Sequence, residues 1–431
     1  MFKFKISTAG KTLLLLFCFF VFLNLAVYSE EKTFSLKDCL IYSSDNNPDI
    51  KSYSFKVKAY FSKVGQARSG YLPQLTGSAS YDRSGSQTTD MVRDNNDSLR
   101  LSQLIYDFNK TIYGIQMADE ELSQSNLNLY DTTQSVFLNV VKSYCDVLKN
   151  NHLVEAMKKN VSRMKETLSQ AEAFFLQGTK SKIDVTTAEI NLSSVKLELI
   201  KAENSLKVSY QALYEAMGFT GESSLSLVEI KELIQYGYSL EDSLAFAFKE
   251  RPDIKIMASK VKESTMQEKY NKRGAYPSIT GDGSYSWDGA QYPLGRSWNI
   301  GLNLSWSIFD GGNTIWKVKE AQANTQDYKA QLTSHKNQAK KEVTDYYTTM
   351  TEKHDTLMVN KDRFRQAKEN LDLADGRYKV GMGNIIELTQ AQYEYIKSEA
   401  DVIASTYEYM KAKADLEKST GANLASIYAE E

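Results

Sequence analysis

Large apolar residues and small polar residues alternate strictly along the chain between Trp298 and Ile308. This period of two predicts a β-strand that carries all of its bulky side chains on one face. The length also suits a tilted strand that crosses a membrane. The predicted membrane-facing side chains are Trp298, Ile300, Leu302, Leu304, Trp306 and Ile308.

Three further stretches alternate in the same way: Ile279 to Trp287, and shorter ones that begin at Leu75 and Leu99. A soluble antiparallel sheet that packs on a core would also alternate. Here, however, the second face is almost wholly small and polar, and tryptophans lie toward strand ends, as in the aromatic girdles of outer-membrane barrels. Four strands cannot close a membrane barrel, and lipid does not tolerate an open edge. We therefore expect several chains to contribute strands to one barrel.

Two runs without glycine or proline, Ile115–Gln177 and Asn313–Asp375, are each 63 residues long. A helix of that length would extend roughly 95 Å, far beyond the helices of globular domains. Apolar residues of the first run recur at three- and four-residue steps from Val136 to Phe175, which is typical of coiled-coil packing. A second apolar stripe, from Tyr130 to Leu148, predicts neighbours on both sides, as in the wall of a cylinder. A soluble helical bundle is the alternative.

The chain repeats itself, with corresponding residues 204 positions apart at first and 203 after one deletion. Pro48-Asp49-Ile50-Lys51, for example, returns as Pro252-Asp253-Ile254-Lys255. Each copy predicts a helix that passes this proline, two strands, the long helix, a glycine turn and a returning helix of about 35 residues. We divide the chain into a first repeat (30–218), an inter-repeat segment (219–238) with one short strand within Leu225–Ile230, a second repeat (239–421) and a C-terminal tail (422–431).

The first 29 residues read as a secretory signal peptide. Lysines at positions 3, 5 and 11 precede an apolar stretch from Leu13 to Val27, and we expect cleavage after Ser29. An uncleaved anchor is the alternative. Loss of the three lysines lowers the formal net charge from −2 to about −5, which argues against nucleic acid as a partner.

The sequence indicates no enzyme, metal centre or cofactor site. His152, His335 and His354 are not spaced as metal ligands, and His354 falls on an apolar stripe where packing explains it. Cys39 and Cys145 lie in different predicted helices and are expected to be buried without forming a disulfide. No P-loop, nucleophile elbow or CxxC motif occurs.

The duplicated plan resembles the TolC-like outer-membrane channel proteins of Gram-negative bacteria over essentially the whole mature chain. The resemblance rests on Tyr71-Leu72-Pro73, on Phe309-Asp310-Gly311-Gly312, and on the turns that lead from Gly178 to Asp184-Val185 and from Gly381 to Glu387-Leu388. It implies a mainly α protein with a membrane β portion, built from a duplicated β-β-α module. Three chains would form a 12-stranded outer-membrane β-barrel, continued by a long α-helical barrel across the periplasm.

The same resemblance implies a function and partners. The trimer would be the passive exit duct of a tripartite efflux pump or type I secretion system. It would dock on a periplasmic adaptor protein and on an inner-membrane transporter of the RND or ABC type. The turns Gly178-Thr179 and Gly381-Met382 would contact the adaptor.

By position, Asp184 and Tyr378 would form the contact that closes the periplasmic tip, with Glu387 as an inward-facing acid. Helix capping alone would also explain an acid at the start of each returning helix. Two positions depart from the family pattern: Gly383 stands where a latch arginine is expected, and Gln390 replaces a second acid. The latch network would therefore be reduced.

A function of a different class is also open, that of a periplasmic coiled-coil adaptor or structural scaffold. Adaptors contain long helical hairpins, but they lack paired strands with a tryptophan-rich outer face. Cell fractionation separates the two, because a scaffold is released without detergent.

Overall fold

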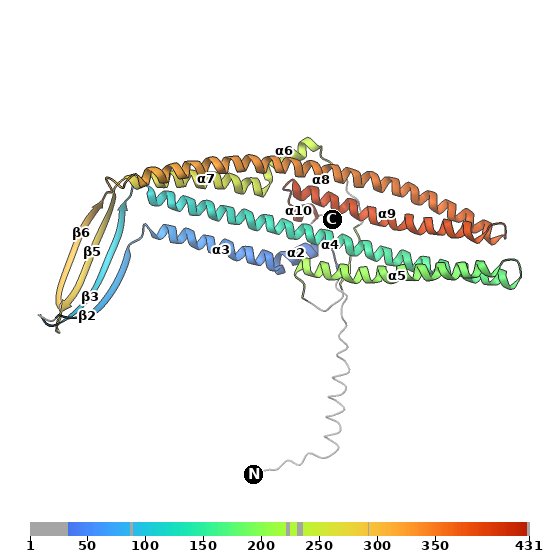
Figure 1. Cartoon of the computed structure of the whole chain (residues 1–431), viewed down its shortest axis with the longest axis horizontal. Coiled ribbons are helices and arrows are strands. Elements are labelled where there is room, and N and C mark those ends of the chain that lie inside the picture. Colours follow the sequence, from blue (N-terminus) through green and yellow to red (C-terminus); the bar gives the residue numbers. More distant parts are fainter. Residues whose placement is uncertain (1–32, 87–88, 221–224, 231–235, 292, 429–431) are drawn as a thin grey trace, which may run out of the picture.

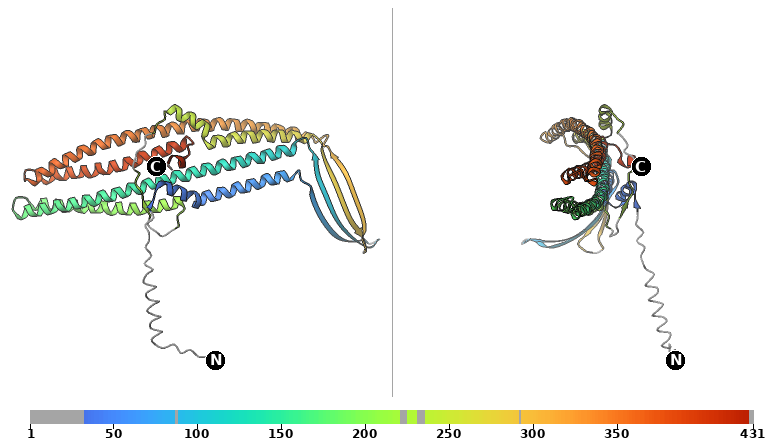
Figure 2. Two further views of the ribbon diagram at one scale, coloured as in Figure 1. Left: turned by 180° about the vertical axis from the view of Figure 1, so that it is seen from behind. Right: turned by 90° about the vertical axis from the view of Figure 1, so that its right-hand side faces the viewer.

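The computed structural model describes residues 33–86, 89–220, 225–230, 236–291 and 293–428. The predicted signal peptide lies outside these residues. The described part is elongated, with a four-stranded sheet at one end and helices along the remaining length (Figure 1). Seen from the opposite end, which we call the tip, two helix pairs lie one above the other (Figure 2).

Two helices of 67 residues run the length of the helical part and confirm the two predicted long helices. Each is four residues longer than its run. The first helix starts five residues earlier and ends one residue earlier, and the second ends four residues later. Two shorter helices lie along each long one, one toward the sheet and one toward the tip (Figure 1). The long helices are α4 (Lys110–Leu176) and α8 (Asn313–Lys379), and their neighbours are α3 (Pro48–Ser69), α5 (Lys182–Met217), α7 (Pro252–Lys272) and α9 (Ile385–Ser419).

The apolar stripes of α4 are buried as predicted. Val140, Val147 and Met164 of the first stripe are inaccessible or nearly so, whereas Phe175 at its end is exposed. Burial of both stripes follows from the neighbours of α4, which packs on α3 and α5 within its own repeat and on α7 and α9 of the other. The two repeats therefore share one continuous helical layer.

The predicted single helix through Pro48 is wrong, because the structure has two helices there. α2 (Leu36–Asn46) ends before Asn47, whose extended backbone suits a residue that precedes proline. The Asn47 side chain then caps α3, since its Oδ1 accepts a hydrogen bond from the Asp49 amide at 2.9 Å. In the second copy, Arg251 separates α6 (Leu240–Glu250) from α7 in the same place.

The glycines that end the returning helices α5 and α9 lie against the backbone at these two helix breaks. Gly218 and Gly421 both adopt positive φ, +68° and +81°. A Cβ on Gly218 would lie 2.9 Å from the Asn47 Cα, and one on Gly421 would lie 2.9 Å from the Arg251 backbone nitrogen. Only glycine therefore fits at either position.

Gly218→Ala should destabilise the protein by about 2–4 kcal/mol, because the strain of a left-handed residue adds to the overlap with backbone. The measurement is the apparent melting temperature of the purified protein in detergent. Gly65→Ala is the matched control, since Gly65 lies inside α3 with open space around its Cα. Equal melting temperatures for the two variants would refute the role of the close approach.

The largest apolar core lies midway along the molecule, where α2, α4 and α5 meet. Two elements that the sequence did not predict complete it. The first is β1 (Thr33–Phe34), which pairs in parallel with β4 (Ser226–Leu227). Of the predicted inter-repeat strand within Leu225–Ile230, only β4 forms. α10 (Leu424–Tyr428), within the predicted C-terminal tail, buries Leu424 fully. Cys39 and Cys145 are buried in this core and form no disulfide, as expected.

Arg251 links three helices beside this core. Its guanidinium donates to Asp253 and to Glu342 of α8, and also to the Ser419 carbonyl of α9, at 2.7–3.0 Å. Burial alone would raise the pKa of Asp253, but hydrogen bonds and the charge of Arg251 lower it below its ordinary value. The folded state thus gains stability from the ionised Asp253 carboxylate.

A group with a depressed pKa contributes stability above its unfolded pKa, about 3.9 for aspartate, and loses it as the pH falls through the folded value. We expect the melting temperature to decrease below about pH 4, and less so in Asp253→Asn. Asp49→Asn is the control, because Asp49 is the corresponding residue of the first copy and has Asn47 before it in place of arginine. A parallel pH dependence in the wild type and Asp253→Asn would contradict this account.

The sheet is antiparallel, in the order β2-β3-β5-β6. Its strands are β2 (Gln74–Ser86), β3 (Thr89–Tyr106), β5 (Ser278–Gly289) and β6 (Gly295–Ser305). The predicted extent of β6 is wrong, because the strand ends at Ser305 and leaves Trp306 and Ile308 beyond it. Ser305 pairs with Ser278, and Pro277 just before has no N–H with which to continue the ladder. The Trp306 indole instead donates to the Ala275 carbonyl at 3.1 Å.

Candidate membrane sheet and periplasmic tip

One face of the sheet is apolar across all four strands, because the register aligns the alternating residues. Trp298 lies opposite Tyr285, and Tyr285 opposite Leu99. Two residues further along, Ile300 lies opposite Gly283, and Gly283 opposite Leu101. The side chains that the sequence placed on this face, Trp298, Ile300, Leu302 and Leu304, are all exposed, and so are Trp306 and Ile308 after the strand.

This exposure is unusual for large apolar residues: Ile300 is 80% and Leu302 is 76% exposed. No described helix packs on either face of the sheet, which stands apart from the helices (Figure 1). A contiguous apolar surface of this kind indicates contact with lipid or with another protein. The opposite face is small and polar, as the hydrogen bond between the Ser78 and Ser98 hydroxyls at 2.7 Å illustrates.

The sheet also has two free edges among the described residues. β2 pairs only with β3, and β6 only with β5. Each edge strand therefore leaves a row of backbone N–H and C=O groups without partners among those residues. Such groups are costly in a hydrocarbon environment.

β3 leads into α4, and β6 leads into α8, through the same hydrogen-bonded junction. The Asp107 carboxylate accepts hydrogen bonds from the amide and hydroxyl of Thr111, at 2.7 and 2.5 Å. Asp310 and Thr314 repeat the arrangement at 2.8 and 2.6 Å. An aspartate four residues before a threonine in both copies is the sequence signal for this junction, which the sequence analysis did not identify.

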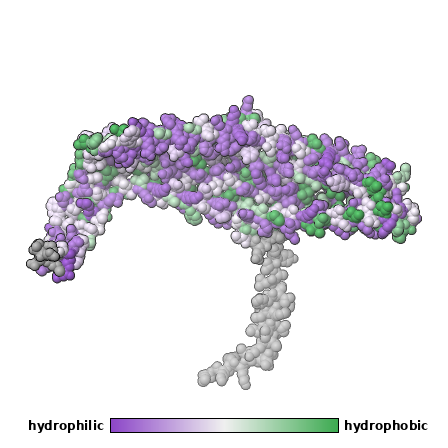
Figure 3. Space-filling model, viewed as in Figure 1, coloured by the Kyte–Doolittle hydropathy of each residue, from purple (hydrophilic) through white to green (hydrophobic). Residues whose placement is uncertain are grey.

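The flanks of the helical layer carry exposed apolar side chains toward the tip. On α5 they recur every seven residues at Ile183, Ile190 and Leu197. On the opposite flank, α8 exposes Val359 and Leu373. Hydrophobic patches are visible on the tip half of the surface in Figure 3. Both flanks therefore offer apolar surface to a neighbour.

At the tip, each long helix ends in a glycine with positive φ, Gly178 at +72° and Gly381 at +80°. The predicted docking turns are accessible there, and Met382 is 78% exposed. The capping interpretation of Asp184 is confirmed, because Asp184 completes a capping box with Ser181 at the start of α5. On α9 the cap is Asn384, whose side chain accepts a hydrogen bond from the Glu387 amide at 2.8 Å.

Tyr378 is completely buried at the tip, where its ring packs edge-on against Phe174 of the other repeat at 5.8 Å. Its hydroxyl has no hydrogen-bond partner among the described residues. Burial raises the pKa of Tyr378, and the nearby Asp184 carboxylate raises it further. The structure thus brings Asp184 and Tyr378 near one another without a hydrogen bond between them.

Glu387 has a different partner from those two residues. Its carboxylate forms an ion pair with Arg377 at 3.0 Å, across the turn between α8 and α9. Both side chains are well exposed, so this pair is worth little energy by itself. It restrains the second turn without reaching the first.

The contact that joins the two turns comes from a residue that the sequence analysis missed. The Lys180 ammonium donates to the Gly383 carbonyl at 2.7 Å and lies 5.5 Å from the centre of the Tyr378 ring. Lys180 and Gly383 correspond to each other at the 203-residue offset, so each lies two residues after the glycine of its own turn. A Cβ on Gly383 would lie 3.0 Å from the Tyr378 backbone nitrogen, so the close approach favours glycine.

Among the residues that the structure describes, no group of His, Cys, Asp and Glu is arranged to hold a metal ion. His354 packs against Tyr409, with the ring centres 5.5 Å apart, which confirms the expected packing role. None of the described helices combines the length and the hydrophobicity that are needed to cross a membrane.

Comparison with known proteins places this architecture in one family. The sequence model of the outer membrane efflux protein family matches residues 43–219 and 245–422, one match in each repeat. The outer membrane protein TolC of Vibrio cholerae is 25% identical over 406 residues, which cover 87% of this chain and 90% of TolC. The outer membrane efflux protein BepC of Brucella suis is 21% identical, covering 86% and 83%.

Solved structures share the fold. A CusC structure superposes with a TM-score of 0.80 at 16% identity, covering 92% of this chain and 96% of that one. The Campylobacter jejuni CmeC outer membrane channel gives 0.78 at 19% identity, covering 95% and 94%. The chain therefore belongs to the outer membrane efflux protein family, as a TolC-like channel protein of the bacterial outer membrane.

Proposed function

We propose that three copies of the chain form the passive exit duct of a tripartite efflux pump or type I secretion system. The observation that carries this proposal is the sheet with one exposed apolar face and two free edges. Pairing β6 of each copy with β2 of the next closes twelve strands into a barrel. Closure satisfies the edge backbone groups, as lipid requires.

The helices support the same assembly. α5 and α8 form the two flanks of the tip half, and both expose apolar residues that a neighbouring copy would cover. At 1.5 Å per residue, α4 and α8 are each about 100 Å long. Three copies side by side would enclose a helical tunnel of that length in the periplasm.

The tip is the gate in this proposal. Asp184, Tyr378 and Glu387 close it together with Lys180, whose bond to Gly383 holds the two turns of one chain together. Docking of a periplasmic adaptor on the exposed turns Gly178-Thr179 and Gly381-Met382, together with an RND or ABC transporter, separates them. The energy for transport comes from these partners, since the channel itself is passive.

The test is extraction of the mature protein from membranes, followed by mass determination and conductance measurements in planar bilayers. We expect release only with detergent, a trimer, and ion-conducting channels. Release in aqueous buffer would favour the periplasmic scaffold, and a monomer without conductance would overturn the proposed duct.

A further inference from the structure

Three exposed arginines lie on the apolar face of the sheet, at the end that points away from the helices. Arg83 follows Tyr81 by two residues in β2, and Arg296 precedes Trp298 by two residues in β6, so each shares the face of its aromatic neighbour. Arg93 of β3 lies directly opposite Arg83 in the register.

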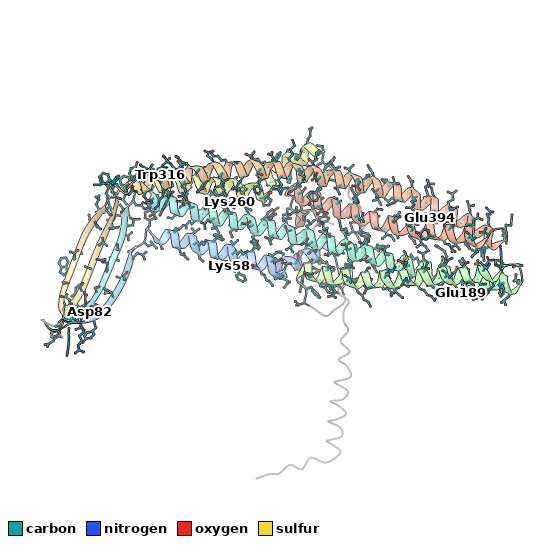
Figure 4. The ribbon with its side chains drawn as sticks, viewed as in Figure 1. Lys58, Asp82, Glu189, Lys260, Trp316 and Glu394 are labelled. Atoms are coloured by element: carbon teal, nitrogen blue, oxygen red, sulfur yellow. The ribbon has the colours of Figure 1, made fainter. Side chains whose placement is uncertain are left out.

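The spacing places these arginines at one boundary of the apolar band. Arg83 lies eight residues beyond Leu75, and Arg296 lies eight residues from Leu304. At about 3.3 Å per residue, both separations are roughly 26 Å along the strand, which a tilt of about 35–45° reduces to roughly 19–22 Å along the membrane normal. The lipid-facing band of outer-membrane barrels is about 25 Å tall, so the two ends of this separation lie close to its two boundaries. Figure 4 shows Asp82, the neighbour of Arg83, at the far end of the sheet.

Charges of opposite sign are separated between the two faces at this end. The alternation puts Asp82, Asp94 and Asp288 on the polar face. Asp97 is the one acid that the described strands place on the apolar face, in the same rung as Arg296 and separated from it by Trp287. The apolar face therefore keeps a net positive charge beside its aromatic residues.

An anion from outside the chain would offset the repulsion between these arginines. Like charges directly opposite each other on neighbouring strands destabilise a sheet, as Arg83 and Arg93 would. None of the three arginines forms an ion pair with another residue in the part of the chain that the structure describes. Guanidinium groups bind phosphate through paired hydrogen bonds, and a long side chain at a membrane boundary extends its charge to the headgroup level.

We propose that Arg83, Arg93 and Arg296 bind the phosphate groups of phosphorylated lipids in the outer leaflet of the outer membrane. The proposal rests on the proposed function in one respect: the helices lie in the periplasm, so the opposite end of the sheet faces outward. In the closed barrel, the edge strands β6 and β2 of adjacent copies would meet. The arginines of three copies then form one basic belt around the outer rim.

The experiment measures binding of diphosphoryl lipid A to the full mature protein in a nonionic detergent, by native mass spectrometry and by melting temperature. We expect binding and a higher melting temperature for the wild type. The affinity of the triple variant R83Q/R93Q/R296Q for lipid A should be lower by at least about tenfold, because each arginine near an anionic surface contributes to the attraction. R100Q is the matched control, since Arg100 lies opposite Ser284 on the polar face and its variant should bind like the wild type.

Two further probes define the ligand. Lipid A without its phosphates, and inorganic phosphate alone, should each leave the melting temperature unchanged. Equal binding of the dephosphorylated lipid, an equal effect of free phosphate, or undiminished binding by the triple variant would each overturn the proposal. If the triple variant does not assemble, R83K/R93K/R296K keeps the charge but loses the paired hydrogen bonds of the guanidinium groups. It should bind diphosphoryl lipid A more weakly than the wild type does, but more tightly than it binds the dephosphorylated lipid. Conductance of the wild-type protein tests the proposed duct separately, because lipid binding and conduction are independent measurements.

Discussion

Ile300→Arg is expected to remove the protein from the outer membrane. Ile300 lies at the middle of the apolar face of β6, four residues from both Arg296 and Leu304. An arginine at the midplane of the lipid face costs about 2–4 kcal/mol. Three copies of the substitution enter each proposed trimer, so the total cost is comparable to the stability of a whole domain. The measurement is the amount of trimer recovered from the outer-membrane fraction.

Asn299→Arg provides the matched control. Asn299 is adjacent to Ile300 in β6, but alternation places it on the polar face, opposite Ser284. We expect normal insertion of this variant, because its arginine would face water inside the barrel. Equal recovery of the two variants would show that the apolar face is not the lipid face.

Lys180→Met is expected to raise the open probability of the channel at rest by about tenfold or more. The substitution removes the hydrogen bond that joins the two turns at the tip. A hydrogen bond from a charged donor is worth roughly 1.5–3 kcal/mol, and about 1.4 kcal/mol corresponds to a tenfold change in an equilibrium. Single-channel recordings in planar bilayers give the open probability directly.

Lys196→Met is the control for the loss of charge, because Lys196 is exposed on α5. It should conduct like the wild type. Asp184→Asn separates the two interpretations of that acid: an increase in resting conductance supports a gating role, whereas a lower melting temperature alone supports capping. Wild-type behaviour of Lys180→Met would remove Lys180 from the gate.

The apolar face of the sheet could be predicted from sequence because it depends only on alternation within one strand. Trp298 to Leu304 are placed correctly for that reason. The end of β6 depends instead on its partner strand, where Pro277 stops the ladder, and so it could not be predicted from the alternation of β6 alone. The break at Asn47 was predictable from the proline that follows, and it was overlooked.

The candidate gate was only partly predictable, for a similar reason. Sequence position identified the tip. Tyr378 lies seven residues after Leu371 and four after Ala374, on the same helix face, and the three are buried together. The bond from Lys180 to Gly383 joins two turns 203 residues apart, and no local pattern encodes it. The absence of an arginine at position 383 predicted a weaker latch. In the structure a basic residue, Lys180, lies in the other turn and donates to the Gly383 carbonyl.

The position of α10 has a consequence for the order of folding. Leu424 and Tyr428 are buried against the core that α2, α4 and α5 form, and the Leu424 amide donates to the Gln134 side-chain oxygen at 2.9 Å. This core stays incomplete until α10 has crossed the inner membrane. A chain that stops after Gly421 would contain every long helix and every strand of the sheet, yet it would leave the centre of the molecule open to water. The subunit can therefore become native only after α10 has been exported.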